Sequence, residues 1–65
     1  MKIDTPIGSI TAEPAVLTEI ALAFYDTSDD YIKRGFNGIA RRNYSVYDTI
    51  WKALNNAGYF NNILE

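Results

Sequence analysis

The sequence predicts a small all-α domain of three helices, with a short extended N-terminal arm and a docked C-terminal tail. Apolar residues recur at spacings of three and four over most of the chain, which is the period of an amphipathic helix. Residues that favour helix ends separate these segments. The chain has 65 residues, which is enough for one domain.

The N-terminal arm, residues 1–11, is expected to be extended. The segment from Thr5 to Gly8 suits a tight turn, because proline favours the second position of such a turn and glycine its fourth. Ile3 and Ile10 stand on either side of this turn. They would either pair in a short hairpin or attach the arm to the core.

The first helix is expected over residues 12–25. Thr11 is a suitable cap, and Pro14 would lie in the first turn, where its missing N–H is tolerated. Apolar residues cover almost the whole circumference of this helix, Leu22 and Tyr25 included. A chain of this length cannot surround such a helix, so part of it is expected to form a contact surface.

The second helix is expected over residues 28–42. It would begin within the cluster at residues 26–30, whose Asp, Thr and Ser side chains favour helix N-termini. Its apolar stripe consists of Ile32, Phe36, Ile39 and Ala40. Gly35 and Gly38 weaken the helix, each by about 1 kcal/mol relative to alanine. They would either allow a close backbone approach or mark a break.

The third helix is expected over residues 46–57. Ser45 is a suitable N-cap, and Gly58 stands where a left-handed residue commonly ends a helix. The apolar stripe consists of Val46, Ile50, Ala53, Leu54 and Ala57. Tyr47 and Trp51, four residues apart, widen this stripe on one side.

The expected C-terminal tail is residues 59–65. Four of its seven residues are large and apolar: Tyr59, Phe60, Ile63 and Leu64. Because transfer of apolar surface out of water is favourable, the tail is expected to dock against the helices.

The composition limits the chemistry open to the chain. There is no histidine and no cysteine, so the commonest general base and the thiolate nucleophile are missing, and neither a disulfide nor a Cys/His zinc site can form. No glycine-rich phosphate-binding loop is present. Asp26, Asp29 and Asp30 fit helix capping better than a calcium loop, which needs glycine where Tyr31 stands. We therefore expect no catalytic residues, no metal and no cofactor.

A cytoplasmic location without membrane association is expected. No apolar run approaches the roughly 18 residues that a membrane-spanning helix needs. The N-terminus lacks the pattern of a secretory signal. The absence of cysteine fits a reducing compartment.

Charge is unevenly distributed along the chain. Residues 1–30 hold one basic and six acidic residues, whereas residues 31–65 hold five basic and two acidic residues. The five basic residues are Lys33, Arg34, Arg41, Arg42 and Lys52. Several would share one arc of the helix at residues 28–42, opposite its apolar stripe. The preferred interpretation of this arc is a solvated polar face. The alternative is a surface that contacts phosphate groups, either of nucleic acid or of a phosphorylated small molecule held by Arg41 and Arg42.

Residues 39–55, Ile-Ala-Arg-Arg-Asn-Tyr-Ser-Val-Tyr-Asp-Thr-Ile-Trp-Lys-Ala-Leu-Asn, resemble the helix–turn–helix of bacterial repressors of the lactose-repressor type. An Ile-Ala pair, a short turn and a Thr-Val/Ile…Ala-Leu-Asn helix recur in that motif at this separation. The resemblance implies a DNA-binding regulator that uses residues 28–57, with the third helix for recognition. The sequence departs from the motif at the turn glycine, where Tyr44 stands.

The preferred function is a non-enzymatic interaction module that self-associates and regulates or inhibits a protein partner. A domain of this size buries only roughly 60% of its unfolded surface, and association is a common aid to its stability. Aromatic residues make up 14% of the chain, and Tyr and Trp are enriched at interfaces. The expected interface residues are Leu22, Tyr25, Tyr47 and Trp51.

Overall fold

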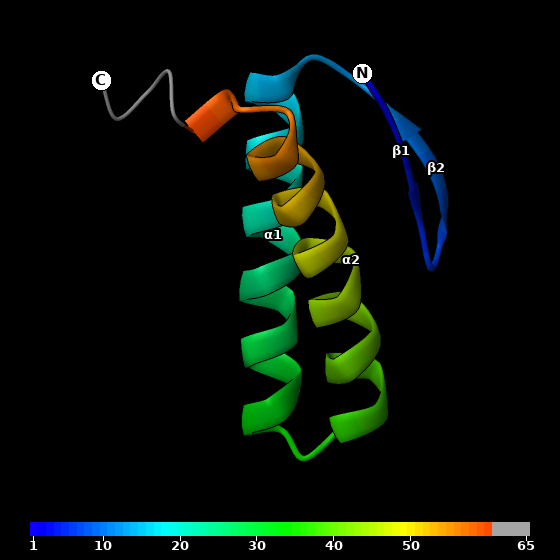
Figure 1. Cartoon of the computed structure of the whole chain (residues 1–65). Coiled ribbons are helices and arrows are strands. Elements are labelled where there is room, and N and C mark those ends of the chain that lie inside the picture. Colours follow the sequence, from blue (N-terminus) through cyan, green and yellow to red (C-terminus); the bar gives the residue numbers. More distant parts are fainter. Residues whose placement is uncertain (61–65) are drawn as a thin grey trace.

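A computed structural model describes residues 1–60 as a β-hairpin followed by two long helices. The elements are β1 (Lys2–Thr5), β2 (Gly8–Thr11), α1 (Pro14–Lys33) and α2 (Asn37–Asn56). Each helix has 20 residues, and the two run antiparallel and side by side, with the hairpin beside α2 (Figure 1). The fold is therefore mostly helical, but the predicted three-helix domain is wrong.

The N-terminal arm is extended, as predicted, and takes the hairpin alternative. β1 and β2 are antiparallel, with Ile3 opposite Ile10, and only Pro6 and Ile7 lie between the strands. Ile3 is 4% exposed and belongs to the same hydrophobic cluster as the buried residues of both helices. Ile3, together with the partly buried Ile10 that packs against the same cluster, attaches the hairpin to the helices.

The predicted break at residues 26–30 does not occur, because α1 continues through it to Lys33. Four of the five polar side chains in this segment have partners. Thr27 Oγ1 donates to Ala23 O (2.9 Å) within α1, and Ser28 Oγ donates to Ala40 O (2.7 Å) on the other helix. Asp29 forms an ion pair with Lys33 (3.0 Å), and Asp30 forms one with Arg34 (3.3 Å). Such residues favour helix ends because their side chains can form hydrogen bonds with nearby backbone groups. Here the side chains bond other groups, so they do not cap a helix end.

The break lies instead at Gly35, which confirms one of the two roles expected of this residue. Its φ of +86° is left-handed, a conformation that glycine adopts without strain. The Phe36 N–H donates to Tyr31 O, and the Gly35 N–H donates to Ile32 O, which together form a Schellman motif. The Tyr31 and Phe36 rings also meet edge to face at 6.2 Å. A three-residue connection then leads into α2.

The second predicted helix boundary, at residues 43–45, is also wrong. α2 runs through it without interruption, so the predicted helices 28–42 and 46–57 are replaced by the end of α1 and the whole of α2. Asn43 Nδ2 donates to Ile39 O (2.8 Å), and Ser45 Oγ donates to Arg41 O (3.0 Å). Bonds of this type satisfy a polar side chain inside a helix.

The start of α1 and the end of α2 lie closer to the positions predicted from the sequence than the ends near the connecting loop do. Pro14 opens α1 in the first turn as expected, although the N-cap residue is Glu13 and not Thr11. α2 ends just before Gly58, whose φ of +79° gives the predicted left-handed stop. Of the predicted tail, Tyr59 and Phe60 pack against the core cluster, and residues 61–65 lie outside the described part of the chain.

The hydrophobic core is concentrated where the hairpin meets the helices. Its buried members are Ile3, Leu17, Ala21, Val46, Ile50 and Leu54. The opposite end, where Gly35 connects α1 to α2, has no further described element over it (Figure 1). Side chains at that end therefore reach solvent.

Candidate functional site

An open groove lies between α1 and α2 near the connecting loop. It has a volume of about 320 Å³, and its walls are Ser28 and Ile32 from α1 and Asn37, Ala40, Arg41 and Tyr44 from α2. A smaller hollow of about 110 Å³ adjoins it and adds Tyr25 and Asp29. We call these two spaces together the interhelical groove.

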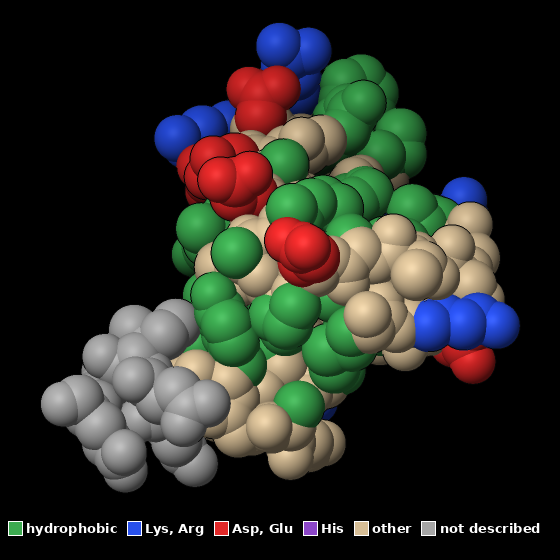
Figure 2. All heavy atoms as spheres, turned by 90° about the horizontal axis from the view of Figure 1, so that it is seen from above, with side chains coloured by type: hydrophobic (Ala, Val, Ile, Leu, Met, Phe, Trp, Pro, Cys, Tyr) green, Lys and Arg blue, Asp and Glu red, His purple; other side chains and the backbone are tan. Residues whose placement is uncertain are grey.

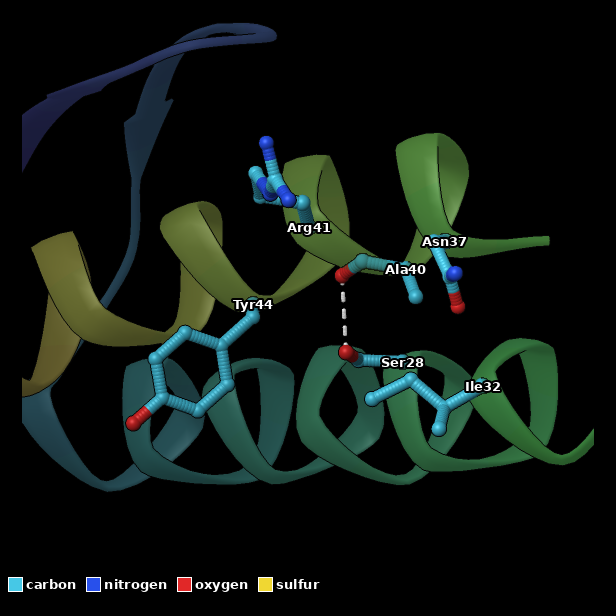
Figure 3. A pocket seen from close by; sticks show the side chains of 6 residues that line it. All are labelled: Ser28, Ile32, Asn37, Ala40, Arg41 and Tyr44. Carbon is cyan, nitrogen blue, oxygen red and sulfur yellow. Dashed lines mark hydrogen bonds between the residues drawn. The ribbon is translucent and has the colours of Figure 1, made fainter. Parts of the chain in front are cut away.

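The floor of the groove is formed by two small buried residues, one from each helix. Ser28 is 2% exposed and Ala40 is 1% exposed. The Ser28 hydroxyl donates a hydrogen bond of 2.7 Å to the Ala40 carbonyl, so no buried polar atom on this floor lacks a partner (Figure 3). Two small side chains at this crossing let the helices approach, and the larger side chains on either side form the walls.

The largest side chains of the walls are apolar or aromatic, and they are exposed. Ile32 is 56% exposed, Tyr44 is 48% exposed and Tyr25 is 45% exposed. Figure 3 shows the Tyr44 ring lying across the gap from α2 toward α1. Leu22 is 46% exposed and stands three residues before Tyr25, on the same side of α1. The groove is therefore bordered by large apolar side chains that the described chain does not cover.

A continuous row of aromatic rings leads from the groove along α2. Successive ring centroids lie 4.5–6.3 Å apart, a distance typical of interacting aromatic pairs. The row consists of Tyr25, Tyr44, Tyr47, Trp51, Phe60 and Tyr59. It connects the exposed groove with the packed end of the molecule.

The four interface residues expected from the sequence fall on this one surface but differ in exposure. Tyr25 is exposed at the groove wall, and Leu22 is exposed one turn before it on α1. Tyr47 and Trp51 are half-buried in the aromatic row and pack against the core cluster. The structure thus brings Tyr25, Tyr47 and Trp51 into contact, and α1 supplies the two more accessible of the four residues.

The expected basic arc does not form on one helix. Lys33 ends α1 and Arg34 belongs to the connection, whereas Arg41, Arg42 and Lys52 lie on α2. Lys33, Arg34 and Lys52 each pair with an acidic residue four positions earlier in the sequence, and the hydrogen bonds to Asp29 and Asp48 raise the pKa values of Lys33 and Lys52. Figure 2 likewise shows acidic and basic side chains side by side on the surface.

Arg41 and Arg42 take no part in the ion pairs of residues 1–60. Both are exposed, but adjacent residues of a helix project about 100° apart, so the two guanidinium groups do not converge on one phosphate. Arg41 stands on the rim of the groove and Arg42 does not line it. Of these two arginines, only Arg41 therefore belongs to the candidate site.

The helix–turn–helix expected within residues 28–57 has no turn at its proposed position. Tyr44, which replaces the turn glycine, lies inside α2. A recognition helix beginning after Ser45 is therefore not a separate element, and the geometry that places such a helix in the major groove is missing.

Two further observations bear on the classes of site. Within residues 1–60, no group of three or more His, Cys, Asp or Glu side chains could hold a metal ion. Neither described helix combines the length and the apolar character that crossing a membrane requires.

Tyr47 is the titratable group that the aromatic row affects most clearly. Burial raises the pKa of its phenol, and the neighbouring Tyr44, Tyr25 and Asp48 raise it further. A phenolate at this position would be poorly solvated and would face other acidic groups. The packing around Tyr47 thus favours the neutral phenol.

This raised pKa predicts a loss of stability in alkali. Because the folded-state pKa of Tyr47 exceeds the unfolded value of about 10, its contribution is complete below pH 10 and is lost as the pH rises through the folded-state pKa. Tyr47→Phe should therefore lose less stability than the unaltered chain above pH 10, measured by urea unfolding across a pH series. Lys33 and Lys52 are present in both proteins, so their titration cancels. Identical losses in the two proteins would contradict this prediction.

The sequence predicted other roles for several of the residues that line the groove. Ser28 and Tyr44 were expected at helix boundaries, and Ile32 and Ala40 in a buried stripe of one helix. The groove forms because these residues come from two helices, and the spacing within one segment does not show which segments pair. The apolar circumference of the first predicted helix, which singled out Leu22 and Tyr25, was the clearest sequence signal for this surface.

Comparisons with protein-family models, with curated proteins and with solved structures gave no match, so the candidate site rests on the geometry of this chain.

Proposed function

We propose that this chain is a non-enzymatic interaction module of the cytoplasm that self-associates and regulates or inhibits a protein partner. The observation that carries the proposal is the exposed apolar surface at the interhelical groove. Leu22, Tyr25, Ile32 and Tyr44 are each 45–56% exposed on neighbouring sides of two helices. Contiguous apolar surface of this kind marks interaction sites in soluble proteins.

The small core supports the same proposal. Two helices cannot enclose a core between them, and the buried hydrophobic residues of the described chain number seven. A chain of this size has a stability of only about 3–10 kcal/mol. Association that covers the groove would remove further apolar surface from water, at roughly 25 cal/mol for each Å². Self-association would therefore stabilise the fold as well as form an interface.

The identity of the exposed residues favours a protein as the partner. Tyr residues provide a large apolar area with a polar hydroxyl, and their side chains lose little conformational freedom on binding. Tyr25 and Tyr44 stand at the groove, and Arg41 stands at its rim. Aromatic residues and Arg are the types enriched at protein–protein interfaces.

Self-association is tested by sedimentation velocity over a range of protein concentrations. The unaltered chain should sediment as a dimer or larger species that dissociates on dilution. Ile32→Lys places a charge on the groove wall and should remain monomeric at concentrations where the unaltered chain is associated, because a buried unpaired charge is costly.

Ile7→Lys is the matched control for this experiment. Ile7 is 53% exposed and Ile32 is 56% exposed, but Ile7 lies in the turn of the hairpin and not at the groove. Ile7→Lys should associate like the unaltered chain, and all three proteins should keep the same helical circular dichroism. A monomeric unaltered chain, or equal effects of the two substitutions, would overturn the proposal.

A further inference from the structure

The two walls of the interhelical groove carry opposite charges. Asp29 lines the groove from α1, and Arg41 lines it from α2. Lys33 bonds one carboxylate oxygen of Asp29, so the other oxygen can still accept. Arg41 forms no ion pair within residues 1–60. The groove therefore has an acidic residue on its α1 border and a basic residue on its α2 border.

We propose that a second copy of this chain covers the groove, in a four-helix bundle whose two-fold axis runs parallel to α1 and α2. This inference rests on the self-association proposed above and specifies its geometry. With this axis, α1 of one copy lies on α2 of the other at the same height along the bundle. Asp29 then faces Arg41 of the partner subunit, and symmetry repeats the pair on the other side.

A face-to-face dimer has one other simple symmetry, with the axis perpendicular to the helices. That arrangement, centred on the groove, sets α1 on α1 and α2 on α2. It brings acidic border to acidic border and basic border to basic border, which is unfavourable. The opposite charges on the two walls thus select the parallel axis.

The length of the contact favours the same axis. The groove lies near one end of two helices that are each about 30 Å long. A perpendicular axis at the groove would overlap only the loop ends of the two copies. A parallel axis aligns the helices along their whole length, so the exposed Leu22 and the aromatic row at Tyr47 and Trp51 also enter the interface. The four residues expected to form an interface would then lie in one contact.

Disulfide cross-linking tests this geometry directly, because the chain has no cysteine of its own. Asp29→Cys and Arg41→Cys are made in separate chains, one of them carrying a mass tag, and the two are mixed and oxidised. A disulfide requires Cα atoms roughly 4.4–6.8 Å apart, so its formation reports contact between these positions. The mixed dimer should be the dominant cross-linked product, and each variant alone should cross-link poorly.

Asp30→Cys with Arg42→Cys is the matched control. Asp30 and Arg42 are exposed and stand one position further along each helix, which turns them about 100° away from the first pair. This pair should give little mixed dimer under the same conditions. Equal cross-linking of both pairs would show unselective collision and would overturn the proposed pairing.

Charge reversal gives a second measurement that does not depend on cysteine chemistry. Arg41→Asp should raise the dimer dissociation constant roughly tenfold at low salt, because it sets two acidic residues against each other at two symmetric places. Asp29→Arg in the same chain should restore association toward the original value. An unchanged dissociation constant in both variants would overturn the proposed pairing.

The outcomes separate this inference from the function on which it rests. A chain that sediments as a monomer at every concentration overturns the proposed self-association. A dimer that cross-links Asp29→Cys to itself overturns only the parallel axis. A dimer with no cross-link in the groove pair that Ile32→Lys still dissociates overturns this inference alone. A dimer that neither shows this cross-link nor responds to Ile32→Lys has its interface on another face and overturns both.

Discussion

Ile50→Ala should remove about half of the folding free energy of this protein. The Ile50 side chain is fully buried and belongs to the core cluster that joins α1, α2 and the hairpin. Truncation of a buried isoleucine to alanine costs about 2–5 kcal/mol, through lost burial and the cavity left behind. A chain of this size has only about 3–10 kcal/mol in total. The midpoint of urea unfolding, followed by circular dichroism at a fixed protein concentration, should fall steeply.

Ile39→Ala is the matched control in the same helix. Ile39 is 49% exposed, so the same chemical change removes little buried surface and leaves no cavity. Its cost should stay within about 0.5–1 kcal/mol. Similar losses from the two substitutions would mean that Ile50 is less closely packed than the structure indicates.

The core residues were the part of the fold that the sequence predicted best. Val46, Ile50 and Leu54 follow a helical period, and all three are fully buried in α2. Ile3 and Ile10 flank a recognisable turn and pair across the hairpin. Period and turn chemistry are local properties, so a single segment contains enough information to show them.

The helix boundaries were harder to predict, because the same residue types serve two purposes. Asp, Asn, Ser and Thr cap helices, but their side chains can also bond inside a helix. Ser28 shows the difficulty: its hydroxyl bonds a carbonyl on the other helix, twelve residues later. Gly35 ends α1 because the chain there needs a left-handed residue, whereas Gly38 lies inside α2. The two glycines differ in backbone conformation and not in any local sequence signal.

The candidate site was only partly predictable, because some of its residues follow from local sequence pattern and others depend on how the two helices pair. Leu22 and Tyr25 were identified because a short chain cannot bury a helix that is apolar on all sides. Ile32 and Tyr44 were assigned to a buried stripe and a turn, and they became groove walls only when α1 paired with α2. A site formed between two helices depends on which faces meet, and this follows from the packing of the whole chain.

The contact between Ser28 and Ala40 provides the strongest test of how the groove is built. Ser28→Leu should destabilise the fold by about 1–3 kcal/mol, because the enlarged side chain has no space between helices that touch at this point. The helices must separate or the leucine must adopt a strained rotamer. Either change alters the groove floor, so Ser28→Leu should weaken self-association as well as lower the midpoint of urea unfolding.

Ser28→Ala separates the effect of size from that of the hydrogen bond. Removal of the hydroxyl forfeits one net hydrogen bond, about 1 kcal/mol, and alanine recovers part of this through its better helix propensity. The Ala40 carbonyl lies within α2 and keeps its helical N–H partner, so no buried acceptor is left empty. Ser28→Ala should therefore remain near the original stability and still associate in sedimentation velocity. If the alanine variant lost as much as the leucine variant, the hydrogen bond and not the close approach would determine how α1 and α2 pair.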